Sequence, residues 1–216
     1  LLNGNNLDFI VYDYLAEITM SIMARARAKD PSKGYAIDFV SSVMKLNLRQ
    51  IADQKVKILS NAGGVNPQAC AEAIRALIKE LNLDLKVAVV LGDDLFEDKE
   101  KLLDSGVQEM YSDEKFPEID KIASINAYLG AFPIAQALND GADIVITGRS
   151  VDSAVTLAAC IHTHGWKEDD YDKLASGSLA GHIIECGTQS TGGNFTDWEL
   201  SSKDLHMIGY PIVDVS

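Results

Sequence analysis

Four short apolar runs divide the chain, and each has the length of a buried strand. They cover residues 8–13, 56–59, 85–91 and 143–147. Their apolar residues are continuous rather than alternating, which is typical of strands covered on both faces of a sheet. We therefore predict a strand for each run.

Segments with apolar residues at helical spacing lie between and after these runs. The predicted helices cover residues 15–29, 36–52, 67–81, 97–105, 127–138 and 151–162. Strands that alternate with helices indicate an α/β fold with a mostly parallel sheet, doubly wound, with helices on both faces. A partial barrel is the alternative, although about four strand–helix units fall short of eight.

The two ends of the chain differ in character from its middle. We expect residues 1–166 to form the parallel α/β core, with residues 111–122 as a charged surface excursion. Residues 167–216 should form a helical and Gly/Thr-rich extension of the same domain, ending in a strand over 210–216. Residues 1–4 resemble a helix end with Gly4 just past the last turn. We therefore expect a fragment of a longer chain.

The charge balance narrows the range of partners. The 216 residues include 32 acidic and 19 basic side chains, for a formal net charge of −13. Such a chain repels phosphate backbones and anionic lipids, so we expect no nucleic-acid partner and no membrane partner. Three scattered cysteines suit a reducing compartment, either the cytoplasm or an organelle matrix after removal of a targeting segment. We also expect a homo-oligomer.

Polar residues follow all four predicted strands. The exits are "YDYLAE" (12–17), "NAGGVNP" (61–67), "GDD" (92–94) and "GRSVDS" (148–153). Ligands of open parallel sheets bind beyond the carboxyl ends of the strands. We therefore predict that the four exits share one edge of the sheet.

The exit "NAGGVNP" contains more glycine than a helix start needs. Asn66 is a good N-cap and Pro67 suits the first helical turn, but neither explains Gly63 and Gly64. Two glycines permit backbone N–H groups to point together at an anion, so Gly63, Gly64 and Asn61 are predicted to bind substrate. A Gly64→Val change would then harm activity more than folding. The segment lacks the features of an ATP or NAD loop.

The exit "GRSVDS" adds a cation to a similar loop. Arg149 can form a bidentate pair with a carboxylate or phosphate, and Ser150 and Asp152 are further candidate substrate-binding residues. The alternative is structural: Ser150 caps the next helix and Arg149 pairs with Asp152 on its surface.

Three side chains are candidate acid–base catalysts: Asp13, Asp93 and His182. Asp13 has Glu17 four residues later, and Asp93 is followed by Asp94, so either pair could move protons or hold a divalent cation. Helix capping is the alternative for both. One helical turn would bring His182 to Glu185 and Cys186, as a catalytic trio or as a histidine satisfied by glutamate. No metal ligand is assigned and the cofactor is unknown.

Several stretches together resemble the acyclic terpene utilisation (AtuA-type) family. The matching stretches include "NAGGVNPQACAEAI" (61–74), "GADIVITGRSVDSAVTLA" (141–158), "GSLAGHIIECGTQSTGGNF" (177–195) and "GYPIVDV" (209–215). The resemblance implies a role in the catabolism of acyclic terpenes, whose route runs through branched acyl-CoA esters, but it implies no particular reaction.

Two functions fit these observations. The first is an enzyme, or a subunit of one, that acts on a small acid or branched acyl-CoA in a lyase or hydratase step. The second is a non-catalytic interaction or assembly protein on an α/β scaffold. An enzyme should gather the strand exits around a pocket, and a scaffold need not.

Overall fold

The computed structural model describes residues 2–3 and 7–215, so Leu1 and Gly4, the bounds of the predicted helix end, lie outside the described residues. Four strands form one sheet: β1 (Phe9–Tyr12), β2 (Lys57–Ser60), β3 (Val87–Val90) and β4 (Ile144–Thr147). Their order in the sheet is β1-β2-β4-β3, and every neighbouring pair is parallel. All four predicted strands are confirmed, and the sheet is open, which excludes the barrel.

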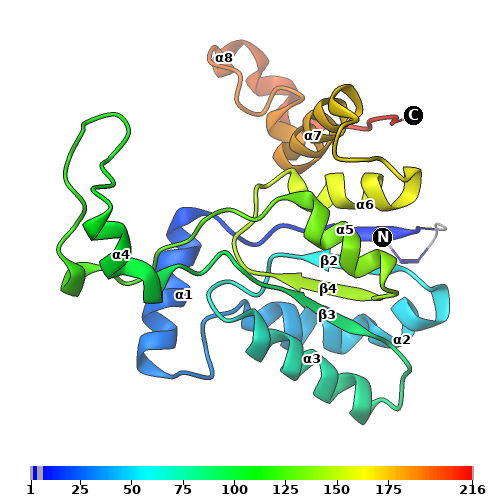
Figure 1. The fold of residues 1–216 in the computed structure, drawn as a ribbon. Helices are drawn as coiled ribbons and strands as arrows, with labels where there is room; N and C mark the ends of the chain where they lie inside the picture. The colour runs from blue at the N-terminus through cyan, green and yellow to red at the C-terminus, as the bar shows by residue number, and fades with distance from the viewer. Residues whose placement is uncertain (1, 4–6, 216) are drawn as a thin grey trace.

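Helices cover both faces of this sheet, as the doubly wound prediction requires (Figure 1). The principal ones are α1 (Glu17–Lys29), α2 (Lys45–Gln54), α3 (Pro67–Glu80), α4 (Lys99–Asp104), α5 (Ala131–Asn139), α6 (Ala154–His164), α7 (Tyr171–Cys186) and α8 (Trp198–Ser201). A π-helical turn, η1 (Phe39–Met44), leads into α2. Helices α2 and α3 lie on one face, while α5 and α6 lie on the other.

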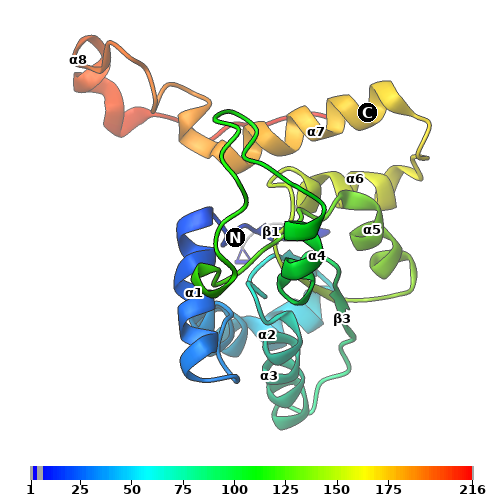
Figure 2. The same ribbon diagram turned by 60° about the vertical axis from the view of Figure 1, so that its left-hand side comes forward.

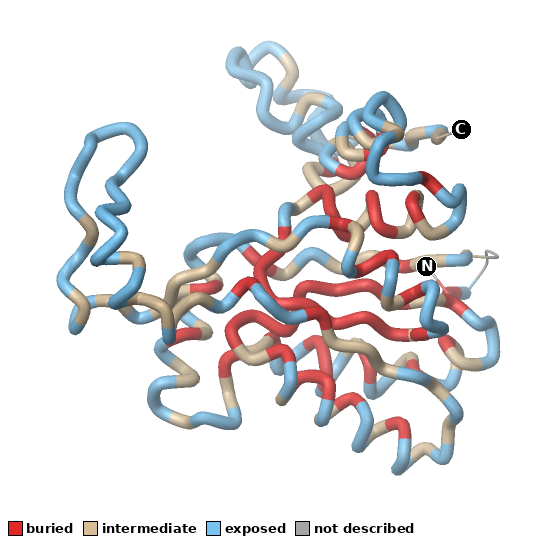
Figure 3. Tube along the Cα trace, in the orientation of Figure 1, coloured by how far each residue is buried: buried red, intermediate tan, exposed pale blue. Residues whose placement is uncertain are grey.

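The core follows from the two-residue period of the strands. Ile58, Ile144 and Ile146 belong to the apolar cluster on the α2–α3 side, whereas Leu59 and Val145 belong to the cluster on the α5–α6 side. All five side chains are fully buried, and the burial map places the buried residues in the sheet and its inner helix faces (Figure 3). Apolar residues in both registers explain why the strands appear as continuous apolar runs.

The C-terminal part of the chain packs outside this layer. Helix α7 crosses over α6, and the chain then continues to α8 away from the sheet (Figure 2). The close approach of α7 needs glycine, because a Cβ on Gly177 would collide with Leu157 and Trp166. Within residues 2–3 and 7–215, no helix has both the length and the apolar character needed to cross a membrane.

Two predicted elements differ from the structure. The helix predicted for 127–138 begins only at Ala131, because residues 126–129 run extended and bridge to the exits of β3 and β4. The strand predicted for 210–216 is wrong, since residues 210–215 have no strand pairing. There the ring of Tyr210 packs on Gly187 and its hydroxyl donates to the carbonyl of Ile184, so this segment lies on α7, whose backbone groups are already paired.

Candidate functional site

The carboxyl ends of the four strands are joined by hydrogen bonds between neighbouring exits. Asn61 after β2 donates to the carboxylate of Asp13 after β1. The Gly63 N–H donates to the Thr147 carbonyl at the end of β4, at 3.1 Å. The exits of β3 and β4 are linked by the Arg149 N–H, which donates to the carboxylate of Asp93. The four exits therefore lie along one edge of the sheet, which confirms the prediction made from their sequences.

Asp93 is a buried carboxylate at this edge, 2% exposed. Its Oδ2 accepts a hydrogen bond from the Arg149 N–H at 2.7 Å and another from the Asn126 side-chain amide at 2.9 Å. Burial raises the pKa of Asp93, and these two hydrogen bonds offset part of that effect. The carboxylate lies so close above Gly148 that a Cβ there would collide with it. The glycine therefore makes room for the acid.

The glycine loop does not form the anion nest expected from the sequence. The N–H groups of Gly63, Gly64, Val65 and Asn66 all donate to backbone carbonyls within or beside the loop. Gly64 has a φ of +56°, and an added Cβ would lie 2.5 Å from the Gly34 carbonyl oxygen. Both glycines are thus required by close packing, so Gly64→Val should also harm folding; that it harms activity more than folding stays a prediction.

A small cavity of about 270 Å³ opens between the exits of β2 and β3. Its lining comes from Gly64, Val65, Asn66, Pro67, Gln68, Leu91, Gly92, Asp93 and Asp94. Asn66 caps α3 and Pro67 occupies its first turn, as predicted. The cavity therefore places a buried carboxylate beside the positive end of a helix dipole.

Arg149 is held by the protein's own groups. Its guanidinium donates to Asp152 at 2.5 Å and to the Ser150 carbonyl at 2.8 Å, and it lies 3.3 Å from Glu17. The guanidinium carbon lies over the Tyr128 ring, 4.1 Å from its centroid. The pairing with Asp152 is the one that the structural alternative expected, although Arg149 is buried rather than on the surface.

Arg149→Lys should lower the free energy of unfolding by about 1.5–3 kcal/mol, the worth of one hydrogen bond to a charged group. Lysine keeps the charge but loses the planar fork, whose Nη1 donates to Asp152 and the Ser150 carbonyl while its Nη2 reaches Glu17. Urea unfolding would measure the loss, with Arg25→Lys on the exposed face of α1 as the matched control. Equal stability of the two variants would show that the hydrogen bonds of the Arg149 guanidinium contribute nothing to the free energy of unfolding.

Two buried polar atoms of this loop have no hydrogen-bond partner among the described residues: Arg149 Nε and Ser150 Oγ. The structural alternative for Ser150, a cap on the following helix, is wrong, because α6 begins only at Ala154 and its first turn is not capped by a side chain. Buried polar atoms without partners are costly and are often satisfied by water or ligand. In the loop after β4, Arg149 Nε and Ser150 Oγ could therefore each donate a hydrogen bond to a water or a ligand.

The acidic pairs noted in the sequence separate in space. Glu17 accepts from the Tyr128 hydroxyl, a hydrogen bond that, together with Arg149, lowers the pKa of Glu17 to about 2, whereas Asp13 bonds to Asn61. Asp94 turns away from Asp93 and forms an ion pair with Arg27 at 2.8 Å. Neither pair converges as a cation site requires.

His182 lies near the end of α7, and the predicted turn does bring it to Glu185 and Cys186. His182 Nε2 is 3.7 Å from Cys186 Sγ, and His182 Nδ1 is 3.8 Å from Glu185 Oε2. No hydrogen bond or ion pair of the described residues joins this trio to Asp13 or Asp93. The three candidate catalytic residues are thus not one constellation.

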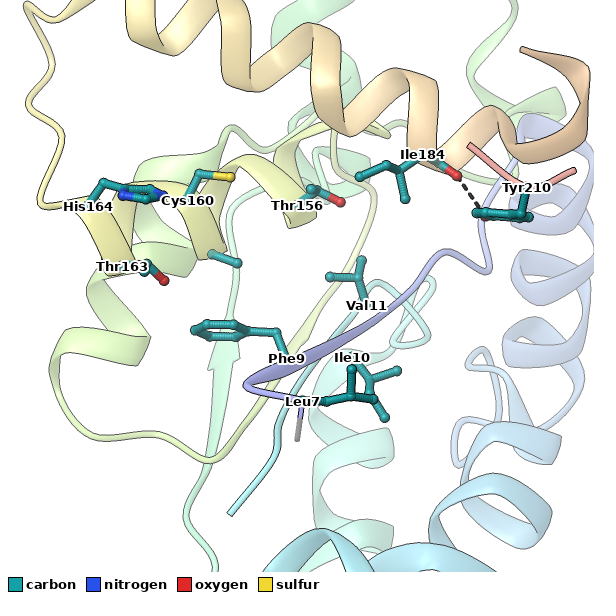
Figure 4. Close-up of a pocket in the computed structure, with 11 residues that line it drawn as sticks. Leu7, Phe9, Ile10, Val11, Thr156, Cys160, Thr163, His164, Ile184 and Tyr210 are labelled. Atoms are coloured by element: carbon teal, nitrogen blue, oxygen red, sulfur yellow. Dashed lines mark hydrogen bonds between the residues drawn. The ribbon is translucent and has the colours of Figure 1, made fainter. Parts of the chain in front are cut away.

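A larger, mostly apolar cavity of about 660 Å³ lies between β1, α6 and the end of α7 (Figure 4). Its lining comes from Leu7, Phe9, Ile10, Val11, Thr156, Ala159, Cys160, Thr163, His164, Ile184 and Tyr210. Burial raises the pKa of the Cys160 thiol, which keeps it neutral. A cavity with this lining suits an apolar ligand or part of one.

Sequence reasoning missed Asn126 and Tyr128. Both lie on the extended segment before α5, Asn126 just before the predicted helix and Tyr128 inside it, and they contact Asp93 and Arg149 respectively. The one local feature of the sequence that could have indicated the extended segment is Gly130, which directly precedes α5 and limits how early that helix can begin.

The chain is thus an open parallel α/β protein whose four strand exits share one edge of the sheet, with the buried Asp93 at that edge. The family model described as "Acyclic terpene utilisation family protein AtuA" matches residues 1–216, the whole chain. The chain therefore belongs to the AtuA family. Neither the curated proteins nor the solved structures contain a match.

Proposed function

We propose that the chain is an enzyme, or an enzyme subunit, that binds an acyl thioester and moves a proton next to its carbonyl group in a lyase or hydratase step. The observation that carries the proposal is Asp93: a buried carboxylate with a raised pKa that borders a cavity at the carboxyl edge of a parallel sheet. Acids and bases of catalytic sites combine burial and a shifted pKa in this manner.

The charges around the small cavity favour a thioester over a free acid. Asp93 and Asp94 both line the cavity, and the nearby cation Arg27 is already paired with Asp94. The charge of Arg149 is shared with Asp152 and Glu17. The carboxylate of a free acid would meet net negative charge in this cavity, whereas a thioester carbonyl is neutral until the reaction begins.

Arg149 and Ser150, with Asp152 holding Arg149 in place, would then stabilise the negative charge that develops on the thioester oxygen. Glu17 is the weaker partner of Arg149, at 3.3 Å with a side chain 77% exposed, so the oxyanion that develops on the thioester can replace it. Arg149 Nε and Ser150 Oγ are further donors without partners among the described residues. Asn61, Gly63 and Gly64 would shape the wall opposite, with Asp13 held by Asn61 as a second acid.

The apolar cavity of Figure 4 would take the acyl chain. Val11 in its lining comes just before Asp13, so the cavity lies beside the same edge of the sheet. The strands β1 and β3 are three spacings apart, roughly 14 Å, which suits a long ligand rather than a small acid alone.

Ala159→Leu should weaken binding of a branched medium-chain acyl thioester roughly tenfold. The larger side chain would fill space in the apolar cavity and exclude about two methylene groups of the ligand, each worth about 0.8 kcal/mol. Isothermal titration calorimetry would measure the change, with the acetyl thioester as the control ligand, whose affinity should not move. An equal effect on both ligands would remove the cavity from the acyl site.

A thermal-shift screen of CoA thioesters, matching free acids and divalent metals tests the proposal as a whole. A ligand present at 100 times its Kd should stabilise the fold by about 2.7 kcal/mol. We expect a thioester to stabilise the chain more than its free acid. Stabilisation by the free acids alone would contradict the charge argument.

A non-catalytic assembly protein is the second candidate, and exposed apolar side chains favour it. Met110 and Tyr111, after α4, and Leu200 and Met207, in and after α8, are 74–87% exposed. Such a surface fits a self-association or partner contact, and the expected homo-oligomer belongs to either candidate. Substitutions there would change the oligomeric state but leave thioester binding intact if the first candidate is correct.

A further inference from the structure

The end of α7 carries three donors of different chemistry within one helical turn. His182, Glu185 and Cys186 are spaced i, i+3 and i+4, which places them on one side of the helix. Within residues 2–3 and 7–215 they are the one group of three or more His, Cys, Asp or Glu side chains whose donor atoms all lie within 4.8 Å of one another. We propose that these three side chains bind a divalent transition metal ion, with Zn²⁺ as the best match.

The spacing of the donors agrees with a tetrahedral site. Ligands about 2.0–2.3 Å from a zinc ion lie roughly 3.3–3.8 Å from one another. Cys186 Sγ is 3.4 Å from Glu185 Oε2 and 3.7 Å from His182 Nε2. The other imidazole nitrogen, Nδ1, lies 3.8 Å from Glu185 Oε2. A small rotation of the ring would therefore let one nitrogen bind the same ion as Glu185 and Cys186. The side chain of His182 is 64% exposed and is free to make it.

The electrostatic surroundings favour a cation at this point. Cys186 is the last residue of α7, where the helix dipole is negative. The carboxylates of Glu185 and Asp152 are the charged groups that act on its thiol. The same negative charges attract a metal ion, which would displace the thiol proton and bind the thiolate.

The donor set selects the type of metal. One nitrogen, one oxygen and one sulfur ligand suit Zn²⁺ and its neighbours, whereas Mg²⁺ and Ca²⁺ require oxygen ligands. All three ligands come from one side of the ion, so its remaining positions face solvent. Water or a ligand donor can occupy them, as in open zinc sites. The site is separate from Asp93 and does not depend on the proposed reaction.

Cobalt binding to the reduced, metal-free chain tests the site. We expect one Co²⁺ per chain, a sulfur-to-cobalt charge-transfer band, and its loss when Zn²⁺ displaces the cobalt. Cys186→Ser should abolish the band, and His182→Ala should weaken binding tenfold or more. Cys160→Ser is the matched control, because Cys160 lines the apolar cavity and should leave the band unchanged.

A wild-type chain that binds neither Co²⁺ nor Zn²⁺ at micromolar metal would overturn the proposal, as would a band that persists in Cys186→Ser. Far-UV circular dichroism checks that α7 remains folded in each variant. If Cys186→Ser alters the spectrum, the affinity of His182→Ala decides the question, since this exposed side chain supports no core contact. Unchanged affinity in His182→Ala would likewise overturn the site.

Discussion

Gly64→Ala is expected to lower the free energy of unfolding by roughly 2–5 kcal/mol. A side chain at a φ of +56° costs about 1–2 kcal/mol. Overpacking adds about 1–3 kcal/mol, because the new Cβ would lie 2.5 Å from the Gly34 carbonyl oxygen, which belongs to a backbone that cannot easily move. For a chain of this size the melting temperature should fall by roughly 4–20 °C.

Gly209→Ala is the control for this experiment, since Gly209 has no positive φ and an added Cβ meets no atom within 4 Å. Chemical denaturation of both variants would compare the two glycines. A stability loss at Gly64 no larger than at Gly209 would contradict the account of a tightly packed loop. A normal stability with lost ligand binding would instead restore the interpretation of Gly64 as a binding residue.

Asp93→Asn is expected to slow turnover by about a hundredfold or more while leaving the fold intact, since a positioned acid or base contributes about 10²–10⁴-fold. The amide oxygen still accepts from the Arg149 N–H, and the neutral group no longer resists burial. As a base, Asp93 is active only when ionised. The wild-type rate should therefore fall as the pH drops through the raised pKa of Asp93, above the ordinary value of 3.8.

Asp94→Asn is the matched control for Asp93→Asn. Asp94 also lines the small cavity, but its carboxylate pairs with Arg27 and lies at an exposed position. Its substitution should change turnover by less than tenfold and leave the acidic limb of the pH profile in place. Equal losses in the two variants would mean that the negative charge of the cavity matters and that proton transfer by Asp93 does not.

The strands and their shared edge were predictable because they depend on local patterns. A buried parallel strand needs a short continuous apolar run, and the chain has four. The exits then meet by geometry alone, since parallel strands end on the same side. The N-cap at Asn66 was predictable for a similar reason, because the cap and its helix are neighbours in sequence.

The contacts of the site were not predictable, since they join residues far apart in the sequence. Asp93 accepts a hydrogen bond from Asn126, 33 residues away, and Arg149 donates one to Glu17, 132 residues away. No periodicity distinguishes an arginine that faces a ligand from one enclosed by carboxylates. The same limit applies to the glycine loop, whose N–H groups could have met an anion but instead meet carbonyls. The strand predicted at 210–216 failed because a β-rich composition does not reveal that residues 210–215 lie on helix α7 rather than beside another strand.

The most direct test of the central claim is the exchange of α-protons of acyl thioesters with solvent deuterium, followed by NMR. It requires no knowledge of the complete reaction, because proton removal next to the carbonyl is the step assigned to Asp93. The account predicts that the wild-type chain accelerates exchange for at least one branched acyl-CoA and that Asp93→Asn is about a hundredfold slower. Exchange that proceeds equally fast with Asp93→Asn, or no acceleration with any acyl-CoA that binds, would contradict it.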